Sequence, residues 1–207
     1  MTRLRIDSGM LYTRSGIPIH LSHANARIAP GLHATGSDGK KSQNDGDNKI
    51  VFLDSGQVGL SNDSLTKLMN SKIQGKGIDD LKVTTDNGKM KISGKMKKVV
   101  SVPVTIEGPA SATPDGKIEL LTRTEKAGFL PIKGLADALG MSINKVVGDK
   151  AKGVKADGDN AIIFDPDELW GLPVHGLVTR VVVQKNGILL IFGAPSHSSK
   201  GHLIAGR

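Results

Sequence analysis

Three histidines near the N-terminus are the first side chains in this sequence whose type could support chemistry. His20 and His23 are three residues apart, and His33 follows ten residues later. Imidazole nitrogens are common ligands of zinc. No carboxylate stands at a spacing typical of a metal site, and the segment has the pattern of strand and loop. We therefore expect no metal centre here.

A group of acidic residues fits part of a calcium-binding loop. Asp157, Asp159 and Glu168 occupy positions 1, 3 and 12 of an EF-hand frame. Position 6 of that frame requires glycine, but the sequence has Ile162 there, and position 5 is Ala161. The pattern therefore argues against an EF-hand.

Signatures of nucleophilic and nucleotide-dependent enzymes are missing from the sequence. It contains no Gly-x-Ser-x-Gly elbow, no Walker or dinucleotide-binding glycine pattern and no cysteine. His175 precedes a predicted hairpin, where we expect a surface or gap-filling residue rather than a catalytic base. Asp165-Pro166 predicts a turn, and Asp167-Glu168 predicts the start of a short helical turn. We predict a protein that is not an enzyme and has no cofactor.

Four lysines could form a basic binding face. Lys89, Lys91, Lys95 and Lys97 alternate with apolar residues, so a strand would place them on one face. The chain has a net charge of +8, and such a face could approach an anionic membrane. We expect no nucleic-acid partner, because this face lacks the aromatic residues on which bases stack. The alternative is that the lysines only solvate an outer sheet face.

The same segment gives the clearest strand signal. Apolar residues between positions 89 and 107 fall mostly on even numbers, and polar residues fall on odd numbers. This alternation predicts strands with one solvated face and one buried face. Gly94 predicts a bulge or bend, and the pair Lys97-Lys98 predicts a break between two strands.

Two amphipathic helices are predicted. Ser61 or Asn62 would cap the first helix, with Asp63 favourable in its first turn. Its apolar stripe consists of Leu65, Leu68, Met69 and Ile73. Pro131 would begin the second helix, and Gly140 would end it. The stripe of the second helix includes Ile132, Leu135, Ala136 and Leu139.

Turn signals place further strands. The Pro-Asp-Gly turn at 114–116 leads into a strand at 118–124, and another short strand is expected at 161–164. The Asn-Gly step at 186–187 predicts a hairpin that joins 177–183 to 187–192.

Together these elements predict an α+β fold, in which two amphipathic helices pack on the apolar face of a meandering antiparallel sheet. Residues 1–33 would add N-terminal strands to the same domain. Residues 34–49 contain almost no apolar side chain, which predicts a flexible loop. Residues 50–193 would form the main body of the domain, and 194–207 a loose tail.

The sequence gives no sign of membrane insertion or export. No segment approaches the ~18 apolar residues of a transmembrane helix. Arg3 and Arg5 are not followed by the apolar stretch of a signal peptide. We expect a cytoplasmic protein, unless a signal or anchor lies outside this chain.

Five motifs occur in order between residues 50 and 193. They are LTKLMN at 65–70, KISGK at 91–95, a Leu-Pro-introduced helix from 130, DNAIIFDP at 159–166 with Pro173 and Gly176, and a valine-rich hairpin at 178–192. In this order they resemble the bacterial members of the tubular lipid-binding (TULIP) superfamily, in particular the LmeA-type envelope proteins. Those proteins normally carry an N-terminal signal or anchor, which is not visible in this sequence.

The resemblance implies that the amphipathic helices pack along a highly curved antiparallel sheet. It also implies an apolar groove between helix and sheet that holds the acyl chains of a phospholipid or glycolipid, in the periplasm or cell envelope. The apolar interior would consist of Leu65, Leu68, Met69, Ile73, Ile92, Val102, Val104, Leu135 and Leu139. The residue pattern leaves open whether these side chains line a groove or pack as a closed core. The predicted function is non-enzymatic lipid binding or transfer. The alternative is a basic scaffold or interaction domain that binds an anionic polymer or a membrane surface.

Overall fold

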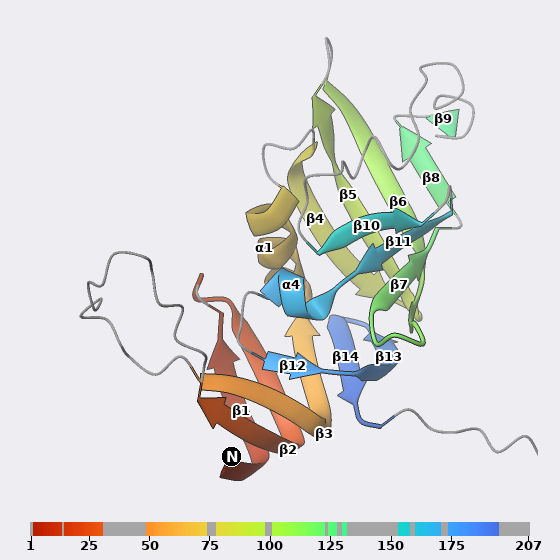
Figure 1. Cartoon of the computed structure of the whole chain (residues 1–207). Helices are drawn as coiled ribbons and strands as arrows, with labels where there is room; N and C mark the ends of the chain where they lie inside the picture. The colour runs from red at the N-terminus through yellow and green to blue at the C-terminus, as the bar shows by residue number, and fades with distance from the viewer. Residues whose placement is uncertain are drawn as a thin grey trace, which may run out of the picture.

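The computed structural model shows a protein built mainly from antiparallel β-strands, which account for 72% of the residues that the structure describes. The residues that it describes are 2–13, 15–30, 49–73, 78–97, 101–122, 124–127, 130–131, 153–157, 160–170 and 174–194. Within them the strands form two sheets, of which the first occupies the lower part and the second the upper part of Figure 1, with α1 beside β4.

The first sheet joins both ends of the described chain. Its order is β1 (Thr2–Tyr12), β2 (Pro18–Pro30), β3 (Lys49–Ser61), β14 (Gly187–Phe192) and β13 (Val178–Gln184). These strands are antiparallel, whereas the short β12 (Val174–Gly176) pairs with β3 in parallel. The predicted C-terminal hairpin is confirmed, since Gln184 pairs with Gly187 across a two-residue turn.

The second sheet contains the middle of the chain. Its order is β10 (Val154–Asp157), β11 (Ala161–Phe164), β7 (Ile118–Leu121), β6 (Ser101–Ala112), β5 (Lys89–Lys97) and β4 (Ile78–Asp86). In addition, β8 (Thr124–Ala127) pairs with β6, and β9 (Leu130–Pro131) pairs with β8. The alternating segment at 89–107 thus forms two paired strands, and the turn at 114–116 leads into a strand as predicted.

Helices play a smaller part than the sequence predicts. The described part of the chain contains only α1 (Asn62–Ile73) and the five-residue α4 (Pro166–Trp170). The predicted α+β fold, with amphipathic helices along one highly curved sheet, is therefore wrong. Leu130 and Pro131 are in a strand, and the remainder of the predicted second helix, including Leu135 and Leu139, lies outside the described residues. The predicted loop and tail lie outside them too, except at Lys49 and Ala194.

A bulge occurs beside Gly94, but in the neighbouring strand. Asp79 pairs with Lys95, and Lys82 pairs with Ser93, so two residues of β4 lie opposite Gly94 alone. One of them, Asp80, has a positive φ of 53°. An extra residue in one strand bends it and increases its twist. The predicted bend therefore exists, and β4 contains the additional residue.

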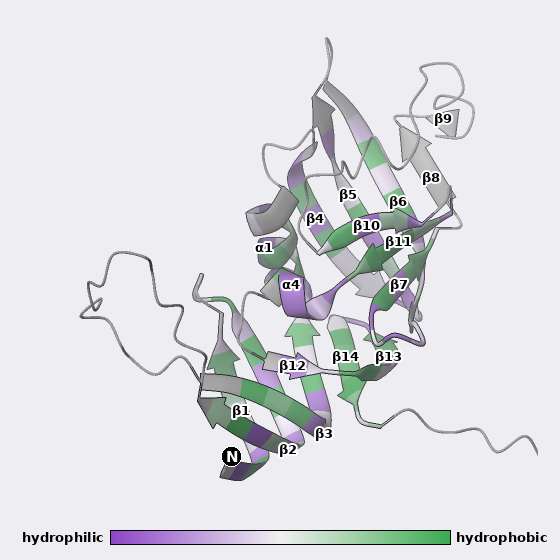
Figure 2. Ribbon diagram, in the orientation of Figure 1, coloured by the Kyte–Doolittle hydropathy of each residue, from purple (hydrophilic) through white to green (hydrophobic). Residues whose placement is uncertain are grey.

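The two sheets share one hydrophobic core. Stretches of apolar residues run along β3, β14 and β11 (Figure 2). Side chains from both sheets are buried in a single cluster, among them Leu21, Val58 and Leu190 from the first sheet and Val83 and Leu120 from the second. The N-terminal strands therefore fold together with the central strands. None of the helices in the described ranges has the length and apolar character needed to cross a membrane.

Candidate apolar binding site

The helix α1 follows β3 directly and begins at a polar cap. The backbone N–H of Ser64 donates a hydrogen bond to Ser61 Oγ at 3.1 Å. A serine oxygen bound to the third helical N–H is a typical N-cap, so the predicted cap is confirmed at Ser61. The hydroxyl of Ser64 donates to the backbone carbonyl of Pro18 at 2.9 Å. The start of α1 is thereby fixed to the first sheet.

A polar stripe of α1 faces the outer edge of β4. Asn62, Thr66 and Asn70 recur at intervals of four residues, which places them on one side of the helix. Thr66 Oγ1 accepts a hydrogen bond from the Val83 N–H at 2.9 Å. Asn70 Nδ2 donates to the Leu81 carbonyl at 2.7 Å.

The same stripe extends to the end of β4. The hydroxyl of Thr85 donates to Asn62 Oδ1 at 2.8 Å. Unpaired edge strands invite pairing with other chains. Side chains of α1 form hydrogen bonds with groups on this edge of β4. These bonds fix the position of the helix, and the helix covers the edge of the strand.

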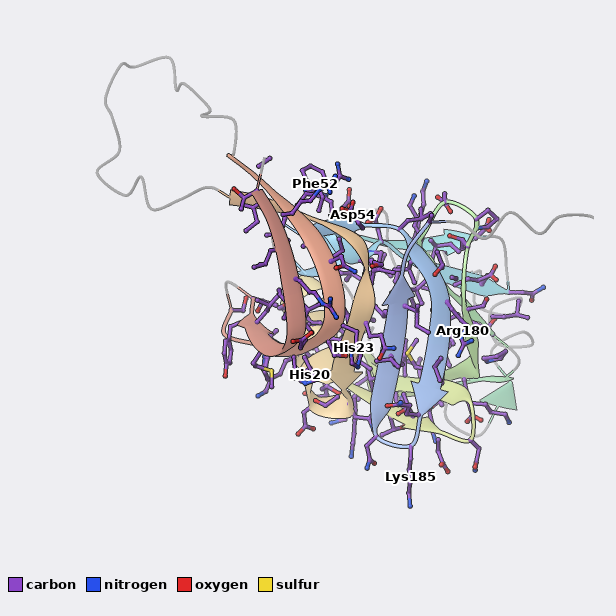
Figure 3. All side chains as sticks on the ribbon, turned by 90° about the horizontal axis from the view of Figure 1, so that it is seen from below. His20, His23, Phe52, Asp54, Arg180 and Lys185 are labelled. Carbon is purple, nitrogen blue, oxygen red and sulfur yellow. The ribbon has the colours of Figure 1, made fainter. Side chains whose placement is uncertain are left out.

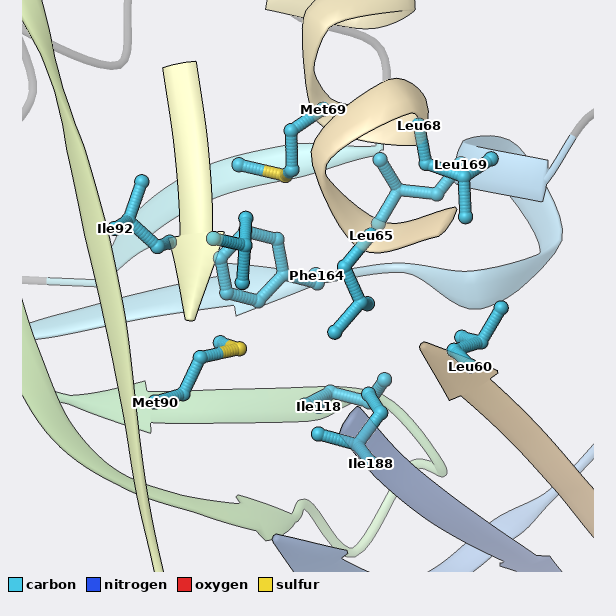
Figure 4. Close-up of a pocket in the computed structure, with 11 residues that line it drawn as sticks. Leu60, Leu65, Leu68, Met69, Met90, Ile92, Ile118, Phe164, Leu169 and Ile188 are labelled. Carbon is cyan, nitrogen blue, oxygen red and sulfur yellow. The ribbon is translucent and has the colours of Figure 1, made fainter. Parts of the chain in front are cut away.

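The apolar stripe of α1 lies against a cavity between the helix and the strands (Figure 4). Leu65, Leu68 and Met69 are all buried, with at most 9% of each residue exposed. The other walls come from β3 and β14, from β4 and β5, from β7 and β11, and from α4. Their side chains are Leu60, Ile188, Val83, Met90, Ile92, Ile118, Phe164 and Leu169.

The cavity is apolar and small. Its volume is about 40 Å³, whereas sites for small molecules usually have roughly 300–1,000 Å³. Apolar cavities stay dry, because a buried water needs several polar partners. In this conformation the space is a packing defect of the core and is too small for an acyl chain.

The residues predicted to form the apolar interior are only partly brought together. Leu65, Leu68, Met69 and Ile92 line the cavity. Val104 is buried in β6 and belongs to the same core cluster. Ile73 and Val102 belong to α1 and β6, but the structure does not describe their side chains. Leu135 and Leu139 are outside the described residues, as stated above.

Several wall residues could not be predicted from local sequence patterns. Ile118 and Phe164 fall in predicted strands, but these strands, IELL and AIIF, are apolar at consecutive positions. A period-2 pattern therefore does not show which of their side chains face the cavity. Leu60 and Ile188 meet only because β3 pairs with β14, and no local pattern indicates such a pairing.

The predicted basic face of β5 is partly neutralised. Lys89, Lys91 and Lys95 are exposed. Lys89 Nζ lies 3.6 Å from Glu107 Oε1, and Lys95 Nζ lies 2.9 Å from Asp80 Oδ2. The hydrogen bond and the charge of Asp80 raise the pKa of Lys95. The structure does not describe the side chain of Lys97. Of the other three lysines, Lys89 and Lys95 each pair with a carboxylate.

A polar cluster lies on the outer surface of β3. Arg27 Nε donates to both carboxylate oxygens of Asp54 at 2.8 Å, and its guanidinium lies 6.0 Å from the centre of the Phe52 ring. The ring of His175 is 5.6 Å from the Phe52 ring, and its Nδ1 is 2.8 Å from Asp167 Oδ2. Each charged group in the cluster has a partner, and the contacts tie β2, β3, β12 and α4 together.

The N-terminal histidines are not part of that cluster. In Figure 3 His20 and His23 lie away from Phe52, and His20 pairs with Gly59 of β3, seven residues further along that strand. The described residues contain no group of three His, Asp or Glu side chains that could hold a metal ion. His33 and Asp159, which belong to the two metal patterns considered, lie outside them.

Comparisons of the chain with protein-family models, with curated proteins and with solved structures found no match. The resemblance to tubular lipid-binding proteins therefore remains a prediction from sequence motifs.

Proposed function

We propose that this protein is a non-enzymatic lipid-binding protein of the cell envelope, which holds an acyl chain between α1 and the strands. The observation that carries the proposal is the composition of the cavity. All of its lining side chains are apolar, and they come from the helix and from both sheets. A phospholipid or glycolipid would place its acyl chain there and its headgroup in solvent.

The volume of the cavity requires a movement before a lipid can enter. About 40 Å³ is available, so α1 must separate from the strands. Met69 and Met90 line the space, and unbranched methionine side chains adapt readily to new surroundings. Each buried methylene of the acyl chain would contribute roughly 0.8 kcal/mol. Several methylenes are needed to offset the cost of opening the helix and ordering the lipid.

Native mass spectrometry of the purified protein, followed by organic extraction, tests the proposal. We expect a co-purified lipid, or uptake of added palmitate, at about one molecule per chain. A lipid-free mass that takes up no palmitate would contradict the proposal. It would leave the alternative of an interaction domain for anionic polymers, whose binding weakens steeply with added salt.

A matched pair of variants localises the binding. Val83→Ile adds one methylene at the wall of the cavity, whereas Val58→Ile adds one methylene to the same core at a position away from it. We expect Val83→Ile to lower palmitate uptake several-fold and Val58→Ile to leave it near the wild-type level. Equal uptake by both folded variants would place the lipid elsewhere.

A further inference from the structure

The strand β1 ends the first sheet and has one partner only. It pairs with β2 along its length, from Thr2 opposite Ile28 to Tyr12 opposite Pro18. Within the ranges that the structure describes, no strand pairs with its other edge. Eleven residues in extended conformation therefore present backbone N–H and C=O groups without a neighbouring strand. Such an edge is a template for another strand.

The side chains of β1 are also unusually apolar for an exposed strand. Leu4, Met10 and Tyr12 are 40%, 50% and 62% exposed. Only one other large apolar residue of the described chain is comparably exposed, Leu121 at 39%. Proteins usually protect a free edge with charges, proline or a covering element. The strand β1 contains charged residues but no proline, and exposed large apolar groups are a feature of interaction sites.

One end of the second sheet shows how this chain protects an edge strand. There β4 is covered by α1, whose Thr66 and Asn70 bind the backbone of Val83 and Leu81. No described element covers β1 in this way. Among the described elements, the edge of β1 is therefore accessible to a partner strand.

The charges of β1 indicate which partner fits. In an antiparallel pair of two β1 strands with Ile6 on the two-fold axis, Arg5 of each copy lies opposite Asp7 of the other. Arg3 then lies opposite Gly9, so no like charges face each other. An axis through Arg5 or through Asp7 would instead place like charges opposite each other, which is destabilising. The strand is therefore complementary to itself in one register.

We propose that β1 is the surface through which the protein binds a second copy of itself, as an antiparallel β1–β1 pair centred on Ile6. The first sheets of the two copies become one continuous sheet. A closed two-fold pair leaves no further free β1 edge, so assembly stops at the dimer. The proposal is independent of lipid binding, because β1 contributes no side chain to the wall of the apolar cavity.

Sedimentation equilibrium of the full chain, from micromolar to millimolar concentration, tests this interface. We expect a reversible dimer. The double variant Leu4→Lys/Met10→Lys should be monomeric, because it places like charges along the shared edge. Leu121→Lys changes an equally exposed leucine on β7 and should remain dimeric. A wild-type monomer at every concentration, or a dimer that persists in the folded double variant, would overturn the proposal.

A charge exchange tests the register. Arg5→Asp or Asp7→Arg alone should raise the dimer dissociation constant about tenfold, since each creates like-charge pairs at two symmetric positions. The combined variant Arg5→Asp/Asp7→Arg should restore the wild-type constant. Both residues are highly exposed, at 83% and 88% for their side chains, so circular dichroism should show an unchanged fold. Single variants without effect, or a combined variant that stays weak, would contradict the pairing centred on Ile6.

Discussion

Thr66 of α1 and Val83 of β4 bind each other as two neighbouring strands would. Thr66 Oγ1 accepts a hydrogen bond from the Val83 N–H at 2.9 Å, and its hydroxyl lies 3.4 Å from the Val83 carbonyl oxygen, to which it donates. A single side chain thus satisfies both backbone groups of an edge residue. The helix is held to the strand by this polar contact as well as by its apolar stripe.

Replacing Thr66 by valine keeps the shape of the side chain and removes the hydroxyl. We expect Thr66→Val to lower the free energy of unfolding by about 1–2 kcal/mol, because Val83 is left with unsatisfied backbone groups. Thr84→Val, on the exposed side of the same strand, should change it by no more than about 0.5 kcal/mol. Urea unfolding measures both values. Equal effects would show that the Thr66 contact does not stabilise α1.

The buried side chains of Leu68 and Val104 should not tolerate a charged replacement. Leu68 is 5% exposed and Val104 is 4% exposed, so an unpaired carboxylate at either position would be strongly unfavourable. We expect Leu68→Asp and Val104→Asp each to prevent stable folding, as seen by circular dichroism. Leu121→Asp, at an exposed position, should leave a cooperative unfolding transition. Folded variants at Leu68 and Val104 would show that these side chains are not part of a closed core.

Two glycines in turns should respond differently to alanine. Gly88 and Gly116 have φ values of 75° and 80°, a region that costs an L-residue roughly 1–2 kcal/mol. A Cβ on Gly88 would meet open space, whereas a Cβ on Gly116 would collide with Leu177. We expect Gly88→Ala to lower the unfolding free energy by about 1 kcal/mol, and Gly116→Ala to lower it at least twice as much. Thermal unfolding compares them, and a smaller loss at Gly116 would contradict the packing seen around Leu177.

The turn before β7 contains a carboxylate with a lowered pKa. Thr113 Oγ1 donates to Asp115 Oδ1 at 2.6 Å, and Lys117 Nζ lies 3.3 Å from Asp115 Oδ2. The hydrogen bond from Thr113, followed by that from Lys117, lowers the pKa of Asp115. We expect Thr113→Val to raise that pKa toward the ordinary value, by more than Lys117→Gln does. NMR titration of the Asp115 carboxyl carbon measures the change.

The lowered pKa of Asp115 also determines how the stability of the fold changes with pH. A lowered pKa in the folded state favours the charged carboxylate, so Asp115 stabilises the fold at pH values above its unfolded pKa of about 3.9. This contribution is lost as the pH falls through the lower, folded pKa. Thr113→Val weakens this contribution, so the variant should be less stable than wild type near neutral pH. In strong acid Asp115 is protonated in both proteins, and this part of the stability difference should disappear. A difference that grows toward low pH would contradict this assignment.

Local features of the fold could be predicted from the sequence. The cap at Ser61, the helix after it and the paired strands of the alternating segment all depend on neighbouring residues. A further local signal stands between β4 and β5. Asn87 and Gly88 have positive φ values of 49° and 75°, and the Asn-Gly step between Asp86 and Lys89 is a strong hairpin signal. This step indicates a strand that ends before Asn87 and pairs with the next one, as β4 does with β5.

The division into two sheets could not be predicted in the same way. It depends on the pairing of Gly187 with Ser61, which joins segments far apart in the chain. The cavity walls depend on that pairing as well, because Leu60 and Ile188 lie opposite each other in the same ladder. Periodicity identifies the buried face of each strand, but it contains no information on which distant strand will cover it.

The pairing of β3 with β14 also constrains the order of folding. The strands β1 to β3 form from neighbouring parts of the chain, but their sheet is completed by residues 187–192. The whole second sheet lies between these segments in the sequence, and contacts between distant segments form slowly. During synthesis the N-terminal strands therefore form before β14 is available, and the edge of β3 that pairs with β14 stays exposed. We expect the docking of the C-terminal hairpin to be the slow step, and chains shortened before residue 187 to aggregate through that edge.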